Sequence, residues 1–167
     1  MIGNGRRIVM GLGNTLNRDE GLGVYAVRAL QERLASRAGR GGDGRIEFLD
    51  GGVLGLNLLP IVEEASHLLV LDAINARREP GAVIELKRDE IPLYSGIKLS
   101  DHQVTFQEVL GLAGFRGNLP RYLHMIGIQP ADISIGLEVS PQVAAALPEV
   151  LERAERVLRE WGMVVPR

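Results

Sequence analysis

Short apolar runs alternate along this chain with longer stretches that have helical periodicity. Residues 7–12 form an apolar run bounded by glycines, which predicts a buried strand. From Glu20 onward, apolar residues recur every three or four positions, which predicts a helix that ends near Ala38, where several glycines follow. By the same reasoning we expect a strand, a helix and a strand over residues 45–49, 56–65 and 68–71.

The alternation is looser in the second half of the chain. We expect, in order, a strand, a polar segment, a helix and a strand over residues 81–87, 89–99, 103–113 and 122–128. A last amphipathic helix should begin after Ser140-Pro141 and run to about Trp161, since proline is favoured at the first helical position. Strands and helices in this order predict an α/β fold with a mostly parallel sheet and helices on both faces. We expect a single domain over residues 1–167.

Composition narrows the class of protein. Hydrophobic residues make up 46% and charged residues 24% of the chain, which is typical of a globular domain with a real core. A formal net charge of −2 argues against a nucleic-acid binder with a broad basic surface. The chain has no cysteine, so disulfides, thiol nucleophiles and thiolate metal sites are excluded. Apolar runs such as Ile8–Leu12 are too short for a signal peptide or a membrane span, so we expect a cytoplasmic protein without a membrane partner.

Acidic residues follow three of the predicted strands. They are Asp19 and Glu20 after the first strand, Asp50 after the second and Asp72 after the third. Ligands of open α/β sheets bind beyond the carboxyl ends of the strands, near a topological switch point, so this pattern indicates an acidic site there. A purely structural role stays open, with Asp19 capping the next helix and Asp50 holding a glycine turn.

The glycine pattern GLGNTLNRDEGLG suggests a second, weaker interpretation. Gly11 and Gly13 match the first two glycines of a dinucleotide-binding turn, but Leu16 stands where the third is required. Asp50 could serve as the acid at the end of the second strand, whereas the adjacent acids Asp19 and Glu20 would repel a pyrophosphate. Dinucleotide binding therefore remains a minor alternative.

Histidines add a possible metal site. His67 and His124 lie at or in predicted strands, where packing is the more common role. His102 lies in a polar loop before a predicted helix, and with Glu20 and Asp72 it would complete a set of two carboxylates and one imidazole. Such a set suits a divalent transition metal better than magnesium. Sequence spacing alone does not show that the three residues converge.

Six motifs occur in order between about Arg7 and Val157: GLGNTLNRDEGLGVYAVRAL, DGGVLGLNLLP, LLVLDAI, LSDHQVTFQEVL, IGIQP and GLEVSP. In this set and order the chain resembles the hydrogenase maturation endopeptidases, the proteases of nickel–iron hydrogenase maturation. It implies a single three-layer domain with a twisted, mostly parallel five-stranded sheet between helices. It also implies cleavage of a C-terminal extension from the large-subunit precursor of the hydrogenase, after that precursor has received nickel.

The same resemblance assigns roles to individual residues. The positions that would meet the nickel of the substrate correspond to Glu20, Asp72 and His102, and Asp50 corresponds to a further acid near the cleft. One departure is Val53, where the family usually has a threonine, and it bears on the identity of the substrate more than on activity.

No serine or lysine arrangement suggests a nucleophile, so we expect hydrolysis by activated water, with Glu20, Asp72 and Asp50 as the candidate catalytic acids. The metal would either polarise the scissile bond or serve recognition alone. No tightly bound cofactor is expected, because the nickel-loaded precursor brings its own metal. A non-catalytic, nickel-dependent chaperone for the same precursor is the alternative function.

Overall fold

The computed structural model describes residues 5–37, 46–91 and 105–163. Its strands are β1 (Arg6–Leu12), β2 (Ile46–Gly52), β3 (Ala65–Ala73), β4 (Val83–Lys87) and β5 (Tyr122–Ile128). Its α-helices are α1 (Leu22–Arg37), α2 (Leu59–Glu64), α3 (Phe106–Phe115) and α4 (Pro141–Glu160). Two short 3-10 helices, η1 (Arg18–Gly21) and η2 (Gly55–Leu58), precede α1 and α2. These elements follow the predicted order.

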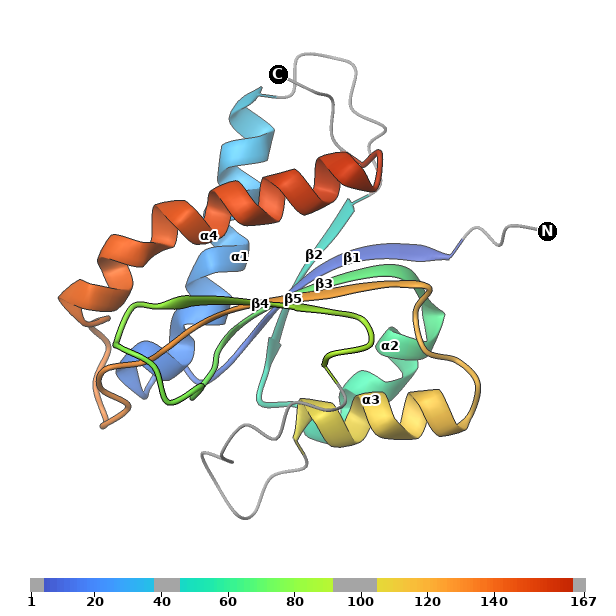
Figure 1. Ribbon diagram of the computed structural model, residues 1–167, viewed down its shortest axis with the longest axis horizontal. Coiled ribbons are helices and arrows are strands. Elements are labelled where there is room, and N and C mark those ends of the chain that lie inside the picture. Colours follow the sequence, from blue (N-terminus) through green and yellow to red (C-terminus); the bar gives the residue numbers. More distant parts are fainter. Residues whose placement is uncertain (1–4, 38–45, 92–104, 164–167) are drawn as a thin grey trace.

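The strands form one five-stranded sheet with the order β2-β1-β3-β5-β4 (Figure 1). β1 pairs in parallel with β2 and β3, and β3 pairs in parallel with β5. β4 is the exception, because it runs antiparallel to β5 at the edge of the sheet. The prediction of a mostly parallel sheet is confirmed.

Helices cover both faces of the sheet, so the fold has three layers (Figure 1). Val9 and Leu69 pack on one face in a cluster with α1 and α4. Their neighbours Met10 and Val70 point to the other face and pack with α2 and α3. Strands buried on both faces explain why the sequence shows continuous apolar runs rather than an alternating pattern.

The two later helices begin at clear capping signals. Thr105 and Glu108 form a capping box at the start of α3, which is why the helix begins inside the predicted range 103–113. Ser140 caps α4, and Pro141 occupies its first turn, as predicted. None of the helices in the described ranges is long and apolar enough to cross a membrane.

Two predicted elements differ from the structure. β3 covers residues 65–73 rather than 68–71, so Asp72 lies inside the strand, opposite Gly127 of β5, and not after its end. The pairing with β1 and β5 extends the strand through residues with no strong strand preference. The predicted helix 56–65 is divided into η2 and α2, with Pro60 in the first turn of α2.

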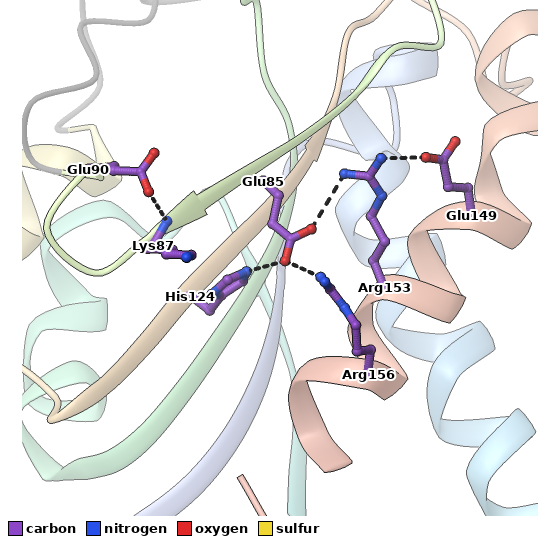
Figure 2. A network of polar contacts seen from close by, with 7 residues as sticks. All are labelled: Glu85, Lys87, Glu90, His124, Glu149, Arg153 and Arg156. Carbon is purple, nitrogen blue, oxygen red and sulfur yellow. Dashed lines mark hydrogen bonds and ion pairs between the residues drawn. The ribbon is translucent and has the colours of Figure 1, made fainter. Parts of the chain in front are cut away.

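A polar network fixes the antiparallel edge strand to the helical layer (Figure 2). Glu85 of β4 contacts His124 of β5 at 2.7 Å, and it accepts hydrogen bonds from Arg153 and Arg156 of α4. Burial alone would raise the pKa of Glu85, but His124 and Arg156 together outweigh burial and lower the pKa. His124 thus has a structural role, as predicted.

Candidate functional site

The strand order brings the predicted acids to one end of the sheet. The chain leaves β1 for β2 on one side, whereas β3 and β5 lie on the other side of β1, so a topological switch point lies between β1 and β3. The segments that follow β1, β3 and β5 gather at the left in Figure 1. We call this end of the sheet the carboxyl edge. Glu20 lies in η1, which contacts β3, the strand that carries Asp72.

Glycines allow the close approach that places Glu20 there. A Cβ on Gly23, in the first turn of α1, would lie 2.2 Å from the Leu71 carbonyl oxygen and 2.3 Å from that of Leu12. A Cβ on Gly13 would lie 1.8 Å from the Glu20 carbonyl oxygen, and Gly13 has a φ of +127°. The glycines of the GLGNTLNRDEGLG pattern therefore serve packing of the turn and helix against the sheet, and they need no nucleotide to explain them.

Asp72 is the most perturbed acid of the site. Burial raises its pKa to about 7, with a further contribution from the negative charge of Glu20, and the backbone N–H of Ala73 offsets this only in part. That N–H donates to Asp72 Oδ1 at 2.8 Å. η1, which carries Glu20, packs against β3, which carries Asp72, so the charge of Glu20 acts on Asp72. At neutral pH, Asp72 therefore exchanges between its protonated and ionised forms.

Glu20 has a related environment. It is half-buried, and burial raises its pKa above the ordinary value. Within the described ranges no hydrogen bond or ion pair satisfies its carboxylate. Two neighbouring carboxyl groups that lack a cationic partner are a natural binding site for a cation, because a cation would relieve both the burial and the mutual repulsion.

Asp19 has a different role from its neighbour Glu20. Its buried carboxylate accepts four hydrogen bonds, from the backbone N–H groups of Ala131, Asp132 and Ser140 and from the Ser140 hydroxyl. Burial would raise the pKa of Asp19, but these donors together lower it. Contrary to the structural alternative considered from the sequence, Asp19 does not cap α1. It holds the segment after β5 against η1 and so fixes the turn that carries Glu20.

Asp50, the other candidate catalytic acid, lies at the end of β2 and is exposed. One of its oxygens accepts a hydrogen bond from the Gly52 N–H at 3.0 Å, and the other forms an ion pair with Arg28 at 3.2 Å. This matches the role of holding a glycine turn, and a catalytic role for Asp50 would require it to leave Arg28. Val53 lies in the next turn with its side chain 49% exposed.

The predicted third metal ligand, His102, lies outside the described residues. Among the residues that are described, no group of three or more histidine, aspartate or glutamate side chains is arranged to hold a metal ion. His67 stacks on Tyr122 with ring centroids 4.3 Å apart, and its Nδ1 contacts the Ser66 hydroxyl at 2.9 Å. That pair lies at the opposite end of β3 from Asp72, so it does not contribute a nucleophile to the acidic site.

Gln129 of the IGIQP motif was not a candidate site residue, but it holds the segment that follows Asp72. Gln129 is buried at the end of β5, and its Oε1 accepts hydrogen bonds from the backbone of Ala76 and Arg78. Its amide also donates to Asn75 Oδ1. Gln129 thereby fixes the segment that follows Asp72. Its signals in the sequence are its place in the IGIQP motif and before a proline at a strand end, and neither assigned it a role in the site.

Comparison with known proteins shows which proteins this chain is similar to. Residues 24–157 match the family model described as hydrogenase maturation protease. The chain is 41% identical to a hydrogenase expression/formation protein, HupD, of Rhizobium leguminosarum bv. viciae, over 96% of this chain and 77% of that protein. It is 34% identical to the hydrogenase 2 maturation protease of Escherichia coli strain K12, over 97% of this chain and 96% of that one.

Solved structures give the same result for the fold. The hydrogenase maturating endopeptidase HybD from E. coli superposes with a TM-score of 0.84 at 34% identity, over 97% of this chain and 98% of that one. A hydrogenase maturation protease HybD from Thermococcus kodakarensis superposes with a TM-score of 0.67 at 26% identity, over 91% and 98% of the two chains. The architecture and the sequence thus point to the same group of proteins.

Proposed function

Because the chain belongs to the hydrogenase maturation protease family, we propose that this endopeptidase removes the C-terminal extension of a nickel–iron hydrogenase large-subunit precursor after nickel insertion. The membership makes the chain a peptidase of hydrogenase maturation. The proposal adds the site of cleavage, the timing after nickel insertion and a cytoplasmic location. A cysteine-free chain is compatible with that location.

Recognition of the substrate's nickel by Glu20 and Asp72 is the centre of the proposal. The observation that carries it is the pair of neighbouring carboxyl groups at the switch point, one of which has a pKa raised to about 7. A cation displaces the proton from Asp72 and neutralises the repulsion between the two acids. His102 remains the predicted third ligand, as the resemblance implies, and an imidazole would favour nickel over magnesium. The protein itself would keep no tightly bound metal.

Hydrolysis requires a group that takes a proton from the attacking water. Water adds to the scissile carbonyl, a carboxylate accepts its proton, and that proton then passes to the leaving amine nitrogen. Asp72, whose pKa is raised to about 7, would take this role only if Glu20 and His102 hold the nickel without it. Asp50 is the second candidate base, and it would have to give up its ion pair with Arg28 first.

The test is an intact-mass assay of a large-subunit precursor from the same organism, mixed with this protein. Nickel-loaded and nickel-free precursors are compared, each with the unmutated enzyme and with Glu20→Gln. We expect one C-terminal peptide to be lost from the nickel-loaded precursor alone, and only with the unmutated enzyme. Equal cleavage of the nickel-free precursor would refute recognition of nickel. Binding without any change in mass would refute proteolysis and favour the nickel-dependent chaperone.

A further inference from the structure

Exposed apolar side chains gather at the carboxyl edge. In the described ranges ten large hydrophobic side chains are exposed, and seven of them lie in segments that follow β1, β2 or β5. These seven are Leu16, Val53, Leu54, Leu56, Ile133, Ile135 and Leu137. The other three, at Leu112, Phe115 and Tyr122, lie before or at the start of β5, at the other end of the sheet. Gathered apolar surface at one edge marks an interaction site more often than scattered exposure does.

Four of these side chains, Leu16, Ile133, Ile135 and Leu137, form a unit that we call the apolar rim. Backbone hydrogen bonds join its two segments, from Gly136 N–H to the Leu16 carbonyl at 2.8 Å and from Arg18 N–H to the Gly136 carbonyl at 3.0 Å. The Asn17 side chain also donates to the Ile133 carbonyl at 3.1 Å. The rim is therefore part of a bonded structure and not a loose loop.

The rim is held in place and yet stays open to solvent. The buried Asp19 carboxylate holds the segment that carries Ile133, Ile135 and Leu137, because it accepts hydrogen bonds from both ends of that segment. Its most exposed members are Ile135, at 86%, and Leu137, at 69%. Side chains held on a fixed backbone lose little further freedom when a partner binds, which favours binding.

The chemistry of the rim favours an uncharged, apolar partner. The sequence ISIGL at 133–137 contains no charged residue. The neighbouring Asp132 is occupied, because it accepts a hydrogen bond from the Ser134 hydroxyl at 2.6 Å and lies 3.7 Å from Arg18 Nε. The exposed Glu138 directly follows the rim, but the four rim side chains themselves are uncharged, so an apolar segment would remove them from water.

The position of the rim beside Glu20 indicates which partner it binds. Leu16 and Glu20 belong to one hydrogen-bonded turn, in which Asn17 N–H donates to the Asn14 carbonyl and Glu20 N–H donates to the Asn17 carbonyl. The turn therefore places the apolar rim beside Glu20, where a polypeptide cut at the acid pair would lie next to it. We propose that the apolar rim binds an apolar segment of the hydrogenase large-subunit precursor, next to the bond that is cleaved. This inference rests on the proposed function and adds a determinant of substrate specificity to it.

The experiment compares the double variant Ile135→Ser, Leu137→Ser with the unmutated rim. Both forms carry Glu20→Gln, which prevents consumption of the nickel-loaded precursor and removes the same proposed nickel ligand from both. The ratio of their dissociation constants, measured by titration calorimetry, therefore reports the rim alone. We expect the double variant to bind the precursor at least about tenfold more weakly, because two apolar contacts are lost. In the same pair of proteins with Glu20 restored, KM should rise about as much and kcat should change less than about twofold.

Phe115→Ser is the matched control, because Phe115 is 91% exposed but lies away from the carboxyl edge. It should leave both Kd and KM unchanged. Unaltered binding by the rim variant would overturn the inference, even if the unmutated enzyme cleaves the precursor. Weaker binding by the rim variant, together with no cleavage by the unmutated enzyme, would uphold the rim and refute proteolysis. If the rim variant instead turns a dimer into a monomer and still binds the precursor normally, the rim joins two copies of this chain and the inference fails.

Discussion

At the scale of single residues, two consecutive acids have opposite environments. Asp19 is surrounded by hydrogen-bond donors, which lower its pKa, whereas Glu20 is half-buried with a raised pKa. Asp19 is therefore stable as a charged group, and Glu20 is stabilised only when a cation or a proton reaches it. This contrast separates a residue that supports the fold from one that is available for chemistry.

Asp72→Asn should abolish processing of the precursor and stabilise the fold at the same time. Ionising a carboxyl group whose pKa is raised to about 7 costs stability, up to about 4 kcal/mol in principle, and we expect a gain of about 2 kcal/mol because the side chain is partly exposed. Asparagine keeps the oxygen that accepts from Ala73 N–H. Urea unfolding at about pH 8 measures the gain, and the mass assay measures the loss of processing.

The stability gained by Asp72→Asn depends on pH, because the pKa of Asp72 is raised in the folded protein. The folded protein holds the Asp72 proton up to about pH 7, whereas the unfolded chain releases it near the ordinary value of 3.8. The cost of Asp72 therefore appears as the pH rises between these two values, and it is absent below them. At about pH 3, residue 72 should therefore contribute equally to the free energy of unfolding of Asp72→Asn and of the unmutated protein. A variant that keeps processing activity would support the purely structural role of the acids.

At the scale of elements, local sequence pattern predicts most helices and strands. It does not predict the contacts between distant segments that form the site. β1, β5, α1 and α4 are predicted well because their apolar periodicity is strong. The extent of β3 depends on pairing with strands far along the chain, which local pattern does not contain. The role of Asp19 was missed for the same reason, because its partners lie 112 to 121 residues away.

Candidate site residues illustrate the same limit. Alternation of strands and helices predicts that Glu20 and Asp72 share one end of the sheet, and η1, which carries Glu20, contacts β3, which carries Asp72. The pairing of Asp50 with Arg28 of α1 depends on the position of a helix face and could not be predicted. His102 lies outside the described residues, so its role stays a prediction.

Close packing of α1 on the sheet makes Gly23 sensitive to substitution. Gly23→Ala should destabilise the fold by about 3 kcal/mol or more, since its Cβ would lie 2.2 Å from a backbone oxygen of β3 that has no room to move. Processing should fall as well, because α1 adjoins the turn that carries Glu20. Thermal and urea unfolding measure the first effect, and the mass assay measures the second.

Gly111→Ala in α3 is the control, because a Cβ at Gly111 has no neighbour within 4 Å. It should stabilise the protein by about 0.5–1 kcal/mol, as expected for alanine in a helix. Equal effects of the two substitutions would contradict the packing argument.

At the scale of the whole molecule, the two ends of the sheet differ in chemistry. The carboxyl edge carries the acid pair and the apolar rim, whereas the other end carries the stacked His67 and Tyr122 rings, with Trp161 edge-on to His67. A substrate with both a cationic centre and an apolar segment would be oriented by the first end alone. Metal and polypeptide would then contribute separately to recognition.

The purified protein should therefore retain little nickel. We expect less than about 0.1 nickel per chain after dialysis, because carboxylates are weak ligands for nickel and the precursor supplies the remaining ones. Mass spectrometry of the metal content measures this directly. Adding Ni²⁺ without precursor should raise Tm only slightly, since stabilisation depends on the ratio of ligand concentration to Kd. One firmly bound nickel per chain would contradict recognition of a metal that belongs to the substrate.

The turn between β1 and α1 has a consequence for insertions and deletions. Surface loops usually tolerate changes in length, since closing a longer loop costs little. Here Gly13 contacts the Glu20 backbone, Asn17 bonds to Asn14, and Arg18 pairs with Gly136, so nearly every residue has a fixed position. Removing one residue from 14–18 would move the following carboxylates by one place, and the donors around Asp19 would then meet Glu20 instead. Relatives that retain this chemistry should therefore keep the length of this turn constant, even where its residues differ.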